Sequence, residues 1–321
     1  MAAPRQVIPG RFLFVTRRCA LRQFFLRPDD ATNQTVLYCF ALAAQRTNIG
    51  IVLPSVLSNH HHTTLWDPDG RYPEFTEHFH KLTARAMNAL RRRHESFWAS
   101  EPCSVVELAD RAAVMDKLVY AATNAVKDGL VERVRHWPGV NGLADLLADR
   151  EIVVRRPRHF FDPDGEMPET VTLRFVIPEA LGDPAEFRAE LRERVAAVEE
   201  AFAKQRAHSG ARVIGRRGVL AQRWRGRACS HTRRGGLRPL VASRDKWVRL
   251  EAIRRNLAFV AEYRETRKRW LAGADVVFPY GTYWLGRFTP VPVAPGPAQP
   301  AGPFVSPAAS PVAVGPPAVG N

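Results

Sequence analysis

Three consecutive histidines after an apolar run are the feature that most constrains the fold of this chain. The run covers residues 51–57, and His60, His61 and His62 follow two residues later. Successive side chains of a strand point to opposite faces, so a strand here would place His60 and His62 on one face and His61 on the other. Two neutral imidazoles side by side provide half of a site for a divalent metal ion. Three interpretations stay open: one continuous strand, a new antiparallel strand that begins at the histidines after a bend at residues 58–59, and a polar turn that binds nothing.

A second element suited to chemistry lies at residues 110–129, where the spacing predicts an amphipathic helix. Asp110 is of a type that favours the position before a helix, and Gly129 of a type that favours the position after its end. The apolar residues at helical spacing predict its buried side: Val114, Leu118, Ala121, Ala122, Ala125 and Val126. Tyr120 and Asn124 are four residues apart and share a face. A phenol and a carboxamide oxygen there would suit a nucleophile and a ligand for a hard cation, although an ordinary half-buried tyrosine has the same signature.

These two elements together resemble a known family. Residues 59–62 read Asn-His-His-His, and residues 120–131 read Tyr-Ala-Ala-Thr-Asn-Ala-Val-Lys-Asp-Gly-Leu-Val. A hydrophobic strand that runs into Asn-His-x-His, followed by a helix with this tyrosine motif, resembles the HUH single-tyrosine transposases, and among them the REP-associated tyrosine transposases. The resemblance covers roughly residues 8–145. Two positions depart from the family pattern, because His61 stands where a hydrophobic residue is usual and Ala125 where a proline is usual.

The resemblance implies a metal-dependent enzyme that acts on DNA. In the family, two histidines and a polar residue one turn after the tyrosine hold Mg²⁺ or Mn²⁺, and the matching residues here are His60, His62 and Asn124. The tyrosine attacks a phosphodiester in single-stranded or hairpin DNA, which makes Tyr120 the expected nucleophile. Attack would leave a 5′-phosphotyrosine and a free 3′-hydroxyl, and another 3′-hydroxyl could reverse the step without ATP. The implied function is DNA nicking and strand transfer, as in DNA transposition.

The order of the expected elements defines an α+β fold. Strands are expected at residues 11–16, 51–57 and 104–108 and at the histidines, and helices at residues 29–45, 73–90 and 110–129. This order of strands and helices predicts an antiparallel sheet with helices on one face. It looks like the ferredoxin-like core of the HUH family. The expected core domain spans residues 8–145.

The charge balance indicates a polyanionic partner. The chain has 47 Lys and Arg against 32 Asp and Glu, a formal net charge of +15. Nucleic acid is the usual partner for such an excess. A membrane surface is the competing partner, but we find no apolar run of about 18 residues that would span a bilayer. The candidate nucleic-acid contacts are basic residues near the expected core elements and one arginine–tryptophan cluster: Arg17, Arg18, Arg91, Arg92, Lys117, Lys127, Arg223, Trp224 and Arg225.

The second half of the chain differs in composition from the first. We expect residues 146–290 to form a basic, mainly helical extension, with long helices near residues 184–207 and 245–271. Residues 291–321 are rich in Pro and Ala and are expected to be disordered. The 4 scattered cysteines and the absence of a signal-like start predict a cytoplasmic protein with reduced thiols. Both halves of the site lie in one chain, so a monomer or a homodimer would serve.

Three other functions fit parts of this pattern. A replication or mobilisation relaxase would share the His-x-His motif, but such proteins usually carry a helicase, and the chain has no Gly-x-x-x-x-Gly-Lys-Ser/Thr motif. A domesticated, non-catalytic nucleic-acid-binding protein would use only the basic surface. Metal-dependent hydrolysis without Tyr120 would lack a neighbouring carboxylate as general base. Covalent attachment of the protein to DNA would distinguish the nicking enzyme from the last two.

Overall fold

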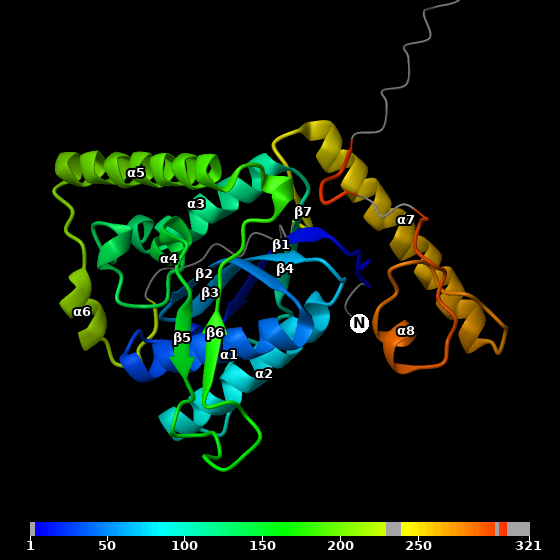
Figure 1. Ribbon diagram of the computed structural model, residues 1–321, viewed down its shortest axis with the longest axis horizontal. Helices are drawn as coiled ribbons and strands as arrows, with labels where there is room; N and C mark the ends of the chain where they lie inside the picture. The colour runs from blue at the N-terminus through cyan, green and yellow to red at the C-terminus, as the bar shows by residue number, and fades with distance from the viewer. Residues whose placement is uncertain (1–3, 229–238, 299–301, 307–321) are drawn as a thin grey trace, which may run out of the picture.

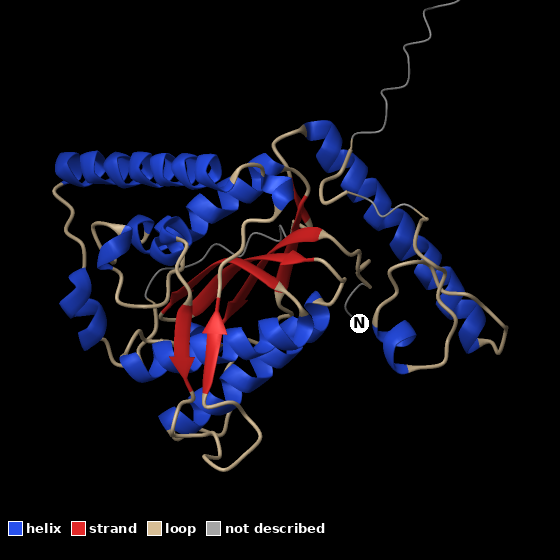
Figure 2. Ribbon diagram, in the orientation of Figure 1, coloured by secondary structure: helices blue, strands red, loops and turns tan. Residues whose placement is uncertain are grey.

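The core of the protein is a 5-stranded sheet with the strand order β2-β3-β1-β4-β7 (Figure 1, Figure 2). The computed structural model describes residues 4–228, 239–298 and 302–306. Neighbours among the first four strands are antiparallel, and β7 is parallel to β4. The strands are β1 (Arg11–Arg18), β2 (Gly50–Leu57), β3 (His60–Asp67), β4 (Ser104–Leu108) and β7 (Val241–Ala242). The order of the first four, with two helices between them, is that of a ferredoxin-like core.

Helices cover both faces of this sheet (Figure 1). The three core helices are α1 (Asp30–Thr47), α2 (Tyr72–Arg91) and α3 (Arg111–Lys127). The ring of His61 lies against Phe40 of α1, whereas the ring of His62, on the opposite face of the same strand, lies against Tyr120 of α3. The predicted α+β class with an antiparallel core is confirmed. The helices lie on two faces instead of the one that we expected, because α3 covers the face opposite α1 and α2.

Local sequence explains where α1 and α3 begin. The Asp29 carboxylate accepts a hydrogen bond from the backbone N–H of Thr32 at 2.9 Å, and the Asp110 carboxylate accepts one from Ala113 at 2.6 Å. Each bond satisfies an N–H that lacks a partner inside its helix. The apolar stripe predicted for α3 is buried throughout. Its packing fixes the rotation of α3 and leaves Tyr120 at the edge of the buried face, 39% exposed.

The second half of the chain packs directly onto the core. α5 (Pro184–Ser209) lies along α3, and the hairpin of β5 (Ile152–Arg155) and β6 (Thr170–Leu173) lies against α1. One cluster of buried side chains includes residues from the core and from α5. The other helices are α4 (Leu143–Ala148), α6 (Gly215–Ala221), α7 (Lys246–Leu271) and α8 (Trp284–Phe288), and the 3₁₀ turns are η1 (Ala20–Arg22), η2 (Val134–His136) and η3 (Glu179–Leu181).

Part of the stretch that was expected to be disordered has defined contacts. The ring of Phe304 stacks on Phe12 of β1 with 5.4 Å between centroids, and the backbone N–H of Val305 donates to the Ala109 carbonyl at 3.0 Å. Residues 299–301 and 307–321 of that stretch lie outside the described residues. Among the described helices, none combines the length and the hydropathy that a membrane span requires.

Candidate active site

A tight turn places the three histidines at the start of β3. β2 ends, residues 58–59 form the turn, and β3 begins at His60. The interpretation in which the histidines open a new antiparallel strand is therefore confirmed. His60 and His62 project toward α3 with 4.8 Å between their ring centroids, whereas His61 projects toward α1 and α2. The strand thus separates two adjacent imidazoles from the third.

Asn59 determines which nitrogen of His60 carries the proton. The Nδ2 of Asn59 donates to the Arg22 carbonyl at 3.3 Å, so its Oδ1 is the atom that lies 2.6 Å from His60 Nδ1. Because Oδ1 can only accept, Nδ1 of His60 must be the donor. The lone pair is then on Nε2, which accepts a hydrogen bond from Nδ2 of Asn124 at 3.2 Å. This arrangement points a metal-competent nitrogen at α3.

His62 is held in a similar way from the neighbouring strand. Its Nδ1 lies 2.7 Å from the hydroxyl of Thr16, the residue directly opposite it in the pairing of β1 with β3. Its Nε2 is buried and finds no hydrogen-bond partner among the described residues. A buried polar atom without a partner is unfavourable unless something binds it. The nitrogen of His62 that faces α3 is thus available to a ligand.

Both imidazoles are neutral near pH 7. Burial lowers the pKa of His60 to about 4, and the positive charges of Arg18 and Arg22 act in the same direction. Burial also holds the pKa of His62 well below its usual value, with the neighbouring histidines adding to the effect. A neutral imidazole keeps the lone pair that metal binding requires.

Tyr120 lies at the mouth of the site. Its ring packs against His62 with 5.2 Å between centroids and against Phe14 with 6.2 Å. Burial raises the pKa of the Tyr120 phenol and so does the charge of Asp128, while Arg18 lowers it. The protein alone therefore keeps the phenol protonated, and attack by its oxygen requires a proton acceptor or additional positive charge.

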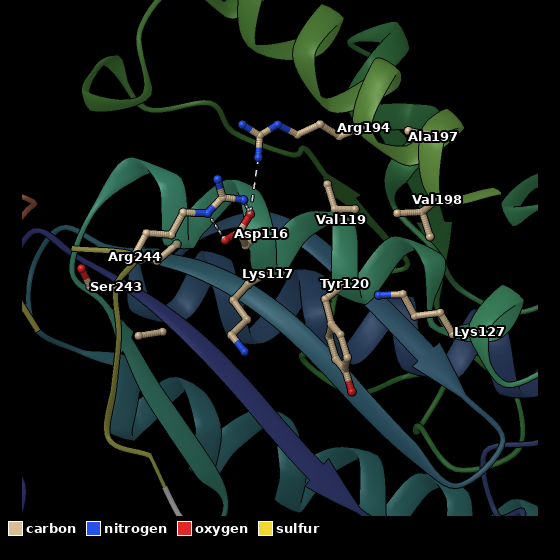
Figure 3. Close-up of a pocket in the computed structure, with 12 residues that line it drawn as sticks. Asp116, Lys117, Val119, Tyr120, Lys127, Arg194, Ala197, Val198, Ser243 and Arg244 are labelled. Atoms are coloured by element: carbon tan, nitrogen blue, oxygen red, sulfur yellow. Dashed lines mark hydrogen bonds and ion pairs between the residues drawn. The ribbon is translucent and has the colours of Figure 1, made fainter. Parts of the chain in front are cut away.

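Two lysines of α3 supply positive charge beside this phenol. The Lys127 ammonium lies 4.8 Å from the centre of the Tyr120 ring and the Lys117 ammonium 5.6 Å from it. Lys117 and Tyr120 project together from α3, and Lys127 lies beside them (Figure 3). Burial lowers the pKa of Lys127, partly opposed by Asp128, and the charge of Lys117 lowers it further. A lysine with a lowered pKa is better able to exchange a proton.

A divalent cation on this face would need the amide oxygen of Asn124 in place of the Nδ2 that contacts His60. Among residues 4–228, 239–298 and 302–306, no three His, Cys, Asp or Glu side chains cluster as a metal site. A cation here would take its protein ligands from Nε2 of His60, Nε2 of His62 and the side-chain amide of Asn124. The Asn124 side chain is 5% exposed and already contacts His60. Two imidazoles and one amide leave further positions for water or substrate oxygens, as Mg²⁺ and Mn²⁺ favour.

The predicted nucleic-acid contacts on the core divide by the face from which they project. Arg18 lies on the face of Thr16 and acts electrostatically on His60 and Tyr120. Arg17 projects to the opposite face, where its guanidinium lies 5.6 Å from the Trp98 ring. Neighbouring residues of a strand cannot both face one ligand.

The remaining predicted contacts lie at the end of α2 and in residues 223–225. Arg91 is bound to the Asp29 carboxylate at 2.7 Å, with its side chain 8% exposed, whereas Arg92 is exposed at the end of α2. Trp224 packs against Phe25 and carries the guanidinium of Arg225 at 4.4 Å from its ring centre, while Arg223 is exposed. Trp224 thus anchors its segment to the core, and the exposed Arg225 adds positive charge to the surface there.

Two residues that support the histidines were missed as site residues. Asn59 was seen only as part of the motif, and its position next to His60 could have indicated its role. Thr16 has no local signal, because its contact with His62 depends on the register of β1 against β3. Contacts between strands that are far apart in sequence cannot be read from spacing.

No protein-family model and no curated protein matches this chain. Two solved structures of transposases are similar to part of it. A REP-associated tyrosine transposase bound to a REP hairpin is 17% identical with a TM-score of 0.37, and the match covers 55% of this chain and 99% of that one. A putative transposase from Deinococcus radiodurans R1 is 14% identical with a TM-score of 0.28, covering 36% of this chain and 93% of that one. Because both the identities and the TM-scores are low, these two similarities do not establish the function of the chain.

Proposed function

We propose that this protein is a metal-dependent nuclease that nicks single-stranded or hairpin DNA and transfers the strand through a tyrosine-linked intermediate. The main support for the proposal is that Tyr120 contacts His62 and Asn124 contacts His60 on one face of the sheet. A phenol beside two neutral imidazoles and an amide is the set that the sequence resemblance implies for phosphodiester cleavage. The net charge of +15 supports a nucleic-acid substrate.

The proposed reaction exchanges one phosphodiester bond for another. The phenolic oxygen of Tyr120 bonds to phosphorus, and the bond from phosphorus to the 3′ oxygen of the preceding nucleotide breaks. The phenol gives its proton to water, and the departing 3′ oxygen gains one. The products are a 5′-phosphotyrosine and a free 3′-hydroxyl, and attack by another 3′-hydroxyl joins strands. Mg²⁺ or Mn²⁺ at His60, His62 and Asn124 would neutralise charge on a non-bridging phosphate oxygen.

All the groups of this site come from one chain, so we propose that a monomer suffices for cleavage. His60 and His62 lie on β3, and Tyr120 and Asn124 lie on α3 of the same chain. A homodimer would be needed only if strand transfer requires two cleaved ends held together.

The decisive experiment looks for a covalent adduct. The protein is incubated with end-labelled single-stranded DNA that contains a hairpin, in Mn²⁺ or Mg²⁺, and the products are separated under denaturing conditions. We expect a labelled protein–DNA adduct that is absent with Tyr120→Phe and retained with Tyr263→Phe, which removes a phenol from α7 outside the site. We expect His60→Ala to reduce the adduct at least 100-fold while the affinity for DNA changes less than twofold, because phosphate contacts supply most of the affinity.

Each other possible result of this experiment would support a different function or nucleophile. An adduct that persists in Tyr120→Phe would reject this nucleophile. Cleavage without an adduct would indicate metal-dependent hydrolysis, and binding without cleavage would indicate a domesticated nucleic-acid-binding protein.

A further inference from the structure

A groove that begins at Tyr120 runs along α3 on the side of α5. It has a volume of about 640 Å³ and lies between α3, α5 and residues 242–244, at the end of β7 (Figure 3). Tyr120, Lys117 and Lys127 line it from the core side. α5 and residues 242–244 belong to the second half of the chain, so the groove exists only because the extension packs on the core.

The groove combines an apolar wall with a cationic edge. Val119 of α3 and Ala197 and Val198 of α5 supply apolar surface. Neither Lys117 nor Lys127 forms an ion pair within the described part of the chain, although both lie within 5.6 Å of the Tyr120 ring centre. Asp128 offsets part of the charge of Lys127, but two cations without an ion pair beside an apolar surface suit a ligand that has an anionic group and a flat apolar body.

At the other end of the groove, one carboxylate of α3 connects the two other walls. Asp116 binds Arg194 of α5 at 3.4 Å and also pairs with Arg244 (Figure 3). These contacts tie α5 and residues 242–244 to α3 and define the groove walls. Arg194 is paired with Glu190 as well, at 2.7 Å, so the free positive charge is concentrated at the Tyr120 end.

We propose that this groove holds the nucleotide next to the scissile phosphate, unstacked from its neighbours. Its base lies against the wall formed by Val119, Ala197 and Val198, and its phosphate contacts Lys127. The inference rests on the proposed function for the position of the scissile phosphate, which lies at Tyr120. It extends that function by assigning the second half of the chain to substrate positioning, with single-stranded nucleic acid as the ligand.

The test fills the groove from its solvent side. Ala197 is exposed on α5 and lines the groove, whereas Ala196 is also exposed but does not line it. Binding of a fluorescent single-stranded oligonucleotide is measured in EDTA, so that no cleavage takes place. We expect Ala197→Trp to weaken binding about 10-fold, the size of a lost base contact, and Ala196→Trp to change it less than twofold. Equal affinity of these two variants would overturn the inference.

A second pair of variants avoids a large side chain. Ala197→Glu places a carboxylate in the groove and Ala196→Glu places one outside it, and glutamate is a good helix former. We expect Ala197→Glu to weaken binding of the single-stranded oligonucleotide about 10-fold and Ala196→Glu to leave it nearly unchanged. If circular dichroism shows that Ala197→Trp is unfolded, this second pair decides the question.

A neutral linkage in the DNA tests the phosphate contact. One methylphosphonate is moved along the oligonucleotide in single steps, and we expect one position at which the wild-type affinity falls. Lys127→Gln should be insensitive to that position, and Lys268→Gln, which removes an exposed lysine of α7, should behave as wild type. A Lys127→Gln profile identical to that of the wild type would overturn the assignment of the phosphate.

The binding experiments with the groove variants and with the methylphosphonate DNA can succeed or fail independently of the adduct experiment. If the adduct forms with the wild type but Ala197→Trp and Ala197→Glu bind as tightly as their controls, the groove inference fails and the proposed function stands. If no adduct forms but the groove variants lose affinity, the proposed function fails and the groove remains a nucleotide-binding surface.

Discussion

Asn59 controls the chemistry of His60 through a single hydrogen bond. Its Oδ1 accepts a hydrogen bond from the N–H at Nδ1, at 2.6 Å, and so keeps the lone pair on Nε2, toward α3. Such supporting contacts orient metal-binding histidines and fix their tautomer. If the proposed site binds a cation, Asn59 is expected to affect the affinity without touching the cation.

Asn59→Ala should weaken Mn²⁺ binding about 10- to 100-fold, because His60 would lose its fixed orientation and tautomer. Isothermal titration calorimetry of the protein without DNA measures this directly. Asn88→Ala, which removes an amide that binds the Glu95 carbonyl at the end of α2, should leave the affinity unchanged. Equal Mn²⁺ affinity of the wild type and Asn59→Ala would contradict the assigned role.

At the residue scale, the sequence predicts which side chains share a face but not what lies opposite them. Tyr120 and Asn124 were placed together by the helical period, and His60 and His62 by the strand period. The period could not reveal that α3 faces His60 and His62 and not His61. That outcome depends on which face of the sheet each helix covers, which is set by the packing of the whole core.

At the scale of elements, Asp29 joins the start of α1 to the end of α2. One of its oxygens caps α1 by accepting from Thr32, and the other binds Arg27 at 2.8 Å and Arg91 at 2.7 Å. Burial alone would raise the pKa of Asp29, but the hydrogen bonds from Thr32, Arg91 and Arg27 outweigh it and bring the pKa to about 2. A predicted DNA contact, Arg91, is therefore committed to holding two helices together.

Asp29→Asn should destabilise the fold by about 2 kcal/mol at pH 7 and by progressively less as the pH falls from 4 toward 2. The pKa of Asp29 is lower in the folded than in the unfolded state, so its contribution is complete above pH 4 and disappears as the folded carboxylate is protonated. Urea unfolding of both proteins between pH 7 and pH 2.5 measures the difference. Asp30→Asn, at the exposed next residue, is the control, and a difference for Asp29→Asn that does not vary with pH would refute the explanation.

At the scale of the whole molecule, local signals located the elements of the first half better than the relation between the two halves. The expected strand and helix order of the core is present, because turns, caps and apolar periods are local features. β7 has 2 residues and joins the sheet beside β4, more than 130 positions earlier in the chain. Neither this pairing nor the packing of α5 on α3 has a local signature, so the groove beside Tyr120 could not be predicted.

The distribution of charge over the whole molecule leads to a final prediction about salt. Arg18, Lys117 and Lys127 lie around Tyr120, whereas Arg244 is paired with Asp116. About three phosphate contacts would give a slope of roughly −2 for the logarithm of single-stranded DNA affinity against that of salt concentration, a loss of about 20-fold between 50 and 200 mM. Fluorescence anisotropy in EDTA measures this slope.

Lys117→Gln should reduce the magnitude of this salt slope by about 0.7, whereas Lys81→Gln, at an exposed position on α2, should not. His60→Ala removes no cation at pH 7 and should keep the wild-type slope, so a slope near zero, or one that changes with His60 and not with Lys117, would show that DNA does not bind at this face.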